Sequence, residues 1–174
     1  MTWGPFTALG RFRQQRVLSD GEYAWAVDIF GATLPPRGHI RLSPALGLKR
    51  RPFTFPSVRG RVMVFLGPDA ADPVRTHPAL FAHELTHVWQ IHHAPHLLPW
   101  LVTAIATQLR YSFGHDVYGI GEAMKPWNRY TLEQQATVVE HWVAHRHGPE
   151  GRRLQHYLDE NIRSARRGSF LPKT

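Results

Sequence analysis

The sequence predicts an α+β domain in which short strands come first and helices fill the C-terminal two-thirds. Before residue 67, short apolar or alternating segments bounded by Gly and Pro predict two or three strands. After residue 77, apolar residues recur at helical spacing in four segments separated by Gly- or Pro-containing breaks. The 174 residues contain no repeat and no Gly/Ser linker. We therefore expect one domain over residues 1–174, with residues 1–17 as a basic N-terminal arm.

The N-terminal elements are predicted by caps and alternation. Ser19 and Glu22 have the spacing of a capping box, and the helix that they open should end near Gly31. Residues 39–42 alternate like a short half-buried strand, and residues 61–66 resemble a second strand. Between the two strands, residues 43–57 are rich in Pro and Arg and predict a loop.

The helical part begins at Pro78, in a helix that should run to about His93. A second helix is expected over residues 97–111, followed by a Gly-rich loop over residues 114–121. Thr131 and Gln134 form another capping-box pair, which opens a helix to about residue 147. Gly148 and Pro149 then break the chain before a last helix over residues 150–166.

Composition excludes several classes of function. The chain has no cysteine, so it holds no disulfide, Cys-type zinc finger or thiol nucleophile. Its net charge of +8 comes from arginines that are dispersed along the chain, so we expect no nucleic-acid partner. The most apolar stretch, residues 97–109, is too short to span a bilayer, and residues 1–17 lack the apolar core of a signal peptide. These features predict a cytoplasmic protein with no membrane partner, unless a dedicated secretion system exports it.

One segment carries metal chemistry. His83 and His87 are four residues apart in a predicted helix, so both imidazoles lie on the same face and can bind one zinc ion. Glu84, beside the first histidine, is placed to take a proton from a water molecule. The sequence therefore predicts a Zn²⁺ site in which two histidines are ligands and the glutamate is catalytic.

A catalytic zinc needs a third protein ligand, and the best candidate is Glu133, in the first turn of the helix that opens at Thr131. Glu140 lies on the same face of that helix, about 10 Å further along the axis. One of these two carboxylates can bind the metal while the other orients a histidine through its free ring N–H. His141 and His145 form another four-spaced pair, which we interpret mainly as structural because apolar residues separate them.

The segment from His83 to Gln90, HELTHVWQ, resembles the active-site helix of a group of small bacterial zincins. This group includes proteins described as Vgr-related and the metallopeptidase-like domain associated with extracellular contractile injection systems. The downstream segment EQQA, which begins at Glu133, is similar to the glutamate helix of the same group. A weaker likeness extends over residues 17–145.

The resemblance implies a small zincin-like fold and a gluzincin-type site, with His83, His87 and Glu133 as zinc ligands and Glu84 as the catalytic acid/base. Many gluzincins place an aspartate four residues after the ligand glutamate, where it supports a ligand histidine. This chain has Thr137 at that position, so the support must come from elsewhere, with Glu140 and Gln90 as candidates.

The reaction implied is hydrolysis of a peptide bond in a peptide or protein substrate. Tyr130 is the preferred donor to the developing oxyanion, with Tyr118 and His115 as alternatives. An extended substrate is expected to pair with the strand over residues 61–66. The alternative function is a non-catalytic zinc-binding interaction module whose partners are components of a secretion or injection system.

Overall fold

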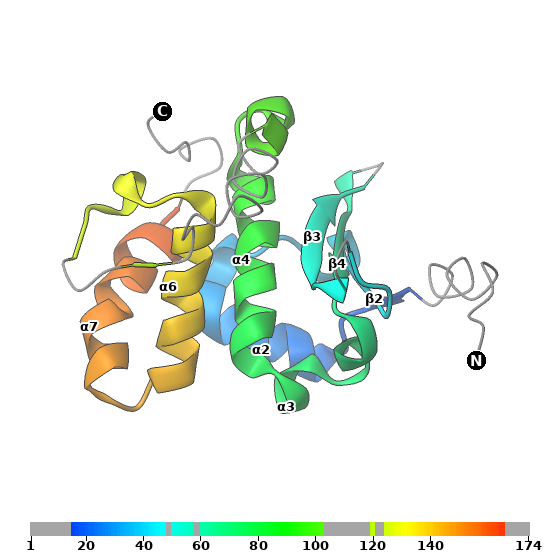
Figure 1. Cartoon of the computed structure of the whole chain (residues 1–174), viewed down its shortest axis with the longest axis horizontal. Coiled ribbons are helices and arrows are strands. Elements are labelled where there is room, and N and C mark those ends of the chain that lie inside the picture. The colour runs from blue at the N-terminus through cyan, green and yellow to red at the C-terminus, as the bar shows by residue number, and fades with distance from the viewer. Residues whose placement is uncertain (1–14, 48–49, 58–59, 103–118, 121–123, 166–174) are drawn as a thin grey trace.

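The computed structural model describes residues 15–47, 50–57, 60–102, 119–120 and 124–165. It contains a small sheet followed by a helix-rich region, so the predicted α+β class is confirmed. Figure 1 shows the helix α4 (Pro78–His93) passing between the sheet on one side and the helices α6 (Leu132–His145) and α7 (Pro149–Tyr157) on the other. None of the helices in the described residues is long and apolar enough to cross a membrane.

The sheet has four strands in the order β1-β2-β4-β3. β1 (Arg16–Val17) is antiparallel to β2 (Ile40–Ser43), β2 is parallel to β4 (Val62–Phe65), and β4 is antiparallel to β3 (Phe53–Pro56). Both predicted strands are present. β4 is buried at all four positions because it lies between β2 and β3.

Two expectations for this region are wrong. The segment predicted as a loop, residues 43–57, contains β3 at its end. Its closing Pro56 suggested a loop, but proline is tolerated on an edge strand, and β3 is one. Because β4 is an interior strand with a neighbour on each side, an extended substrate cannot pair with it. Among the described residues the edge strands are β1 and β3, and β3 is the edge strand next to β4.

The last residues of the predicted N-terminal arm are part of the sheet. The Arg16 guanidinium forms an ion pair with Glu22, at 2.6 Å, and donates to the carbonyl of Ala70. These contacts hold β1 against α2 (Asp20–Phe30) and against the 3₁₀ turn Gly67–Ala71. Residues 1–14 of the arm lie outside the described residues.

The predicted helix starts are reproduced closely, but the last helix, expected to run to residue 166, ends as an α-helix at Tyr157 and continues as a π-helical turn. Both capping boxes form, Ser19 with Glu22 at the start of α2 and Thr131 with Gln134 at the start of α6. α2 ends at Gly31, which has a φ of +63°, a conformation that favours glycine. The remaining helical elements are α3 (Pro73–Thr76), three further 3₁₀ turns (Gly31–Thr33, Arg37–His39 and Trp127–Arg129) and a π-helical turn (Leu158–Ile162) after α7.

Two of the sequence predictions reach beyond the described residues. The expected helix over residues 97–111 is helical over residues 97–102, and the rest of it is outside. Most of the expected Gly-rich loop over residues 114–121 is also outside the described ranges.

α4 is the central element of the core. All ten residues from Phe81 to Gln90 are buried, so this helix is enclosed on every side. Its apolar members, such as Leu85 and Trp89, join residues of α2, the sheet, α6 and α7 in one hydrophobic cluster. The polar members His83, Glu84, His87 and Gln90 are therefore held in a rigid, largely dry environment, where each must find a partner.

Candidate metal centre

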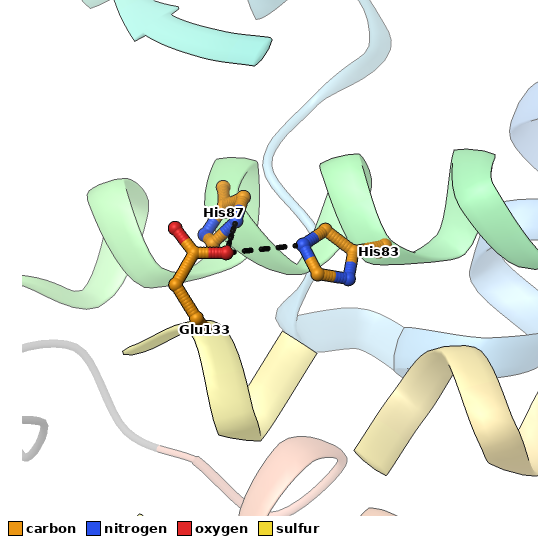
Figure 2. Close-up of side chains that lie close together, drawn as sticks. All are labelled: His83, His87 and Glu133. Carbon is orange, nitrogen blue, oxygen red and sulfur yellow. Dashed lines mark hydrogen bonds and ion pairs between the residues drawn. The ribbon is translucent and has the colours of Figure 1, made fainter. Parts of the chain in front are cut away.

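The ligand geometry joins α4 to the first turn of α6. His83 and His87 extend from one face of α4, and Glu133 extends from α6 toward both of them (Figure 2). The Glu133 Oε2 atom lies 3.3 Å from His83 Nε2 and 3.4 Å from His87 Nε2. Within the described part of the chain, these three residues are the one group whose ligand atoms could hold a metal ion, all within 4.8 Å of one another.

The three side chains are buried, which makes their grouping informative. Each is less than a tenth exposed, and unpaired buried carboxylates and imidazoles are costly. A metal ion would use the Nε2 atoms and the carboxylate oxygen together. The residues present therefore fit a metal ion, as the sequence predicted for His83, His87 and Glu133.

The opposite ring nitrogen of each histidine is held by a second polar side chain. His83 Nδ1 lies 2.8 Å from a carboxylate oxygen of Glu140, and His87 Nδ1 lies 2.9 Å from the amide oxygen of Gln90. Because both acceptors are oxygens, each Nδ1 carries the proton, and each Nε2 is left to face the metal position. Glu140 and Gln90 are the two residues expected to replace the aspartate that the chain lacks at position 137.

Gln90 is itself fixed by a buried amide network. Its side-chain NH₂ group donates to the carbonyl of Leu132, at 2.9 Å, and to the side-chain oxygen of Gln135, at 3.0 Å. The Gln135 NH₂ group in turn donates to the carbonyl of Trp127. Sequence reasoning missed Gln135, because glutamine on a helix has no characteristic spacing. The network ties the orientation of His87 to the start of α6, where Glu133 lies.

Thr137 takes no part in orienting a histidine. Its hydroxyl donates to the backbone carbonyl of Glu133, 3.0 Å away, within the same helix. The carboxylate role is taken one turn later by Glu140, which is about one-third exposed. The carboxylate that orients His83 thus lies on α6, as expected, but at position 140 instead of position 137.

Ionisation in the site follows from the same contacts. Burial alone would lower the pKa of His83, but hydrogen bonds to Glu133 and Glu140 raise it to about 10. Burial likewise opposes protonation of His87, whose pKa is nevertheless raised by the charge of Glu133. The pKa of Glu133 is lowered: burial favours its neutral form, but the two histidines outweigh burial. Without metal, His83 is therefore protonated at neutral pH, and a metal ion bound there would displace that proton.

Glu84 has a different environment from the three ligands. It is 4% exposed, and its carboxylate accepts a hydrogen bond from the Thr54 hydroxyl at 2.7 Å. Burial raises the pKa of Glu84, and the neighbouring histidines only partly oppose this effect. Burial therefore makes this carboxylate hold a proton more readily than an ordinary glutamate does. Thr54 lies on β3, in the segment predicted to be a loop, so no sequence pattern pointed to its role.

The remaining candidate residues lie outside this group. The Tyr130 hydroxyl is 3.4 Å from that of Tyr157 and accepts a hydrogen bond from the backbone N–H of Lys125, so its contacts are with these residues and not with the ligands. Its role as an oxyanion donor stays a prediction. Tyr118 and His115, the alternatives, lie outside the described residues.

The His141 and His145 pair is partly or fully exposed on α6. His145 Nδ1 lies 3.0 Å from the carbonyl of His141, a contact within one helical turn. Neither histidine belongs to the ligand group.

Comparison with known protein families, curated proteins and solved structures finds no match to this chain. The interpretation of the site therefore depends on its own geometry. That geometry brings together two imidazoles and a carboxylate that could hold a metal ion, with the buried carboxylate of Glu84 close enough to interact with their charges.

Proposed function

We propose that this protein is a zinc-dependent peptidase in which Glu84 is the general base. The observation that carries the proposal is the buried group of His83, His87 and Glu133 with Glu84 one residue from the first ligand. Two nitrogens and one oxygen are a typical protein donor set for catalytic zinc, which keeps its fourth position for water or substrate. The resemblance of the HELTHVWQ segment to a group of bacterial zincins supports the same activity.

The donor set and two of the distances between its atoms are compatible with zinc. Two ligand atoms bound to zinc at about 2.0–2.1 Å and at a tetrahedral angle are about 3.3–3.4 Å apart. Glu133 Oε2 lies 3.3 and 3.4 Å from the two Nε2 atoms. Calcium and magnesium prefer sites made of oxygen ligands, so two imidazoles disfavour both.

In the proposed reaction the protein residues have separate tasks. A bound zinc ion would lower the pKa of water and polarise the carbonyl of the scissile amide. Glu84 takes a proton from the attacking water and later gives it to the leaving amine, whose bond to the carbonyl carbon has broken. Glu140 and Gln90 keep both histidines in the tautomer that offers Nε2.

The open edge of β3 is suited to an extended peptide. Ser57 N–H donates to the carbonyl of Arg61, so the alternation of an antiparallel pair directs the backbone groups of Phe53 and Phe55 toward β4. The N–H and C=O of Thr54 then face the open edge, and Pro56 offers only its carbonyl. A substrate strand would pair mainly with Thr54, beside Glu84, and its side chains would contribute little to this pairing.

The experiment is metal analysis combined with cleavage of a quenched fluorescent peptide library. Wild-type protein should contain one equivalent of zinc, and His83→Ala and Glu133→Ala should both lose it. Glu84→Gln should retain zinc and lose turnover by a factor of at least about 10³, because the base is gone. Loss of zinc in Glu84→Gln would mean that Glu84 is a ligand, and the scheme would be wrong.

The deep burial of Glu84 favours one alternative. With 4% of its surface exposed, it has little room for a water molecule, as in a zinc site that serves structure only. The alternative is a non-catalytic zinc-binding module whose partners would be components of a bacterial secretion or injection system. Wild-type protein that binds zinc but cleaves no member of the library would support the module.

A further inference from the structure

The contact between the edge strand β3 and the Glu84 carboxylate is not explained by metal binding. The Thr54 hydroxyl lies 2.7 Å from Glu84 Oε2 and 3.2 Å from the backbone carbonyl of the same residue. A hydroxyl has one proton, and the shorter distance and the negative charge both favour the carboxylate as its acceptor. No other hydrogen bond to this carboxylate is found within the described part of the chain.

Thr54 is well placed to hold the carboxylate still. Its register opposite Val64 is fixed by the β3–β4 ladder, and its neighbour Phe53 stacks on Phe65 with ring centroids 4.2 Å apart. Threonine is also restricted at χ1, so little side-chain freedom is lost when its hydroxyl makes the bond. The position of one Glu84 oxygen is thus set by the sheet and not by the helix that carries the glutamate.

We propose that Thr54 is the positioning residue for Glu84: it fixes one carboxylate oxygen, leaving the other for the proton of the bound molecule. The inference rests on the proposed function, because it assigns Thr54 a role through the general base. It also links two tasks in one residue. The backbone of Thr54 faces the open edge where a peptide would pair, and its side chain holds the base that would act on that peptide.

The inference explains why a threonine is present at position 54 of β3. If the edge strand served only to pair with substrate, any residue at position 54 would offer the same N–H and C=O. A hydroxyl directed at a buried carboxylate is a specific requirement, which valine, of the same shape and strand propensity, cannot meet. Thr54→Val is therefore the decisive substitution, and Thr54→Ser is the conservative one.

The test uses acetohydroxamic acid, a probe that gives a proton to a nearby base and binds a zinc ion through the two oxygens of the resulting acetohydroxamate. Its affinity for the zinc-loaded full chain is measured by isothermal titration calorimetry, together with zinc content. Glu84→Gln sets the loss expected when the base is removed. We expect Thr54→Val to weaken binding on the order of 10-fold with zinc content unchanged, and Thr54→Ser to restore most of the affinity.

A control distinguishes positioning from folding. Thr137→Val also removes a threonine hydroxyl near the site, but the acceptor of that hydroxyl is a backbone carbonyl. It should therefore leave acetohydroxamate affinity within about twofold of wild type, and the urea midpoints of both variants are measured to show that each is folded. Where a cleaved peptide is known, Thr54→Val should lower kcat more than it raises KM.

The outcomes separate the two proposals. If Thr54→Val binds acetohydroxamate as tightly as the wild type while Glu84→Gln shows a large loss, the role of Thr54 is overturned and the proposed function stands. Equal losses in Thr54→Val and Thr54→Ser would also overturn it, because the hydroxyl would not be the cause. Wild-type protein that binds neither zinc nor acetohydroxamate would refute the proposed function, and the role of Thr54 would fall with it.

Discussion

Replacing Glu140 with alanine should weaken zinc binding although Glu140 does not touch the metal position. Its carboxylate lies 2.8 Å from His83 Nδ1, and removing it leaves the imidazole free to rotate or to change tautomer. Loss of such a partner costs about 10- to 100-fold in metal affinity. Because the Glu140 side chain is 34% exposed, water can replace part of the bond, so we expect the lower end, about 10-fold or about 1.4 kcal/mol.

The assay is competition with a fluorescent zinc chelator at neutral pH. Glu140→Gln keeps an acceptor oxygen for the His83 N–H and should lose less affinity than Glu140→Ala. Glu150→Ala is the matched control, because it removes a carboxylate that is about equally exposed on α7 and is paired with Arg153 and not with a histidine. An affinity for Glu140→Ala within twofold of wild type would refute the argument that this carboxylate orients the ligand.

Two further predictions concern the buried amide network and the acid limit of stability. Gln90→Ala should weaken zinc binding about 10-fold, because His87 loses its partner. It should also cost about 1–3 kcal/mol of unfolding free energy, since Gln135 loses a partner. A chelator titration would measure the first effect and urea unfolding the second, and an unchanged urea midpoint would contradict the second. Burial opposes the ionised form of Glu22, but Arg16 and Ser19 lower the pKa of Glu22 below its value in the unfolded chain. The ionised Glu22 carboxylate therefore stabilises the fold above about pH 4.3, and this contribution is lost as the pH falls through the lowered pKa. The difference in unfolding free energy between wild type and Glu22→Gln should thus be constant near neutrality and shrink below about pH 4; a constant difference down to pH 3 would refute the assignment.

Helix starts and the pairing of His83 with His87 were predictable because they depend on local chemistry. The capping boxes at Ser19 and Thr131 need only residues three apart, and the shared face of His83 and His87 follows from helical geometry. Glu133 was predictable from the helix on which it lies and from its likeness to a known group. Apart from that of Glu133, each of these inferences uses a spacing within one element.

Contacts between elements were harder to predict. The sequence left the roles of Glu133 and Glu140 open, because their assignment depends on how α6 is rotated against α4. β3 was missed because four residues ending in proline resemble a loop until the partner strand is known. Because β3 was missed, the edge that it forms and the role of the Thr54 hydroxyl were missed as well. Neither feature has a signature in the sequence of one strand.

The position of the candidate metal site between α4 and α6 has a consequence for the thermodynamics of the whole domain. The two helices that supply the ligands are separated in sequence by residues 94–131, so an ion bound at their interface would act as a cross-link closing a long loop. Because only the folded chain assembles all three ligands, free metal at 100 times its Kd would stabilise the fold by about 2.7 kcal/mol. The fraction of chains that survive proteolysis would then follow the supply of metal, independently of any reaction at the site.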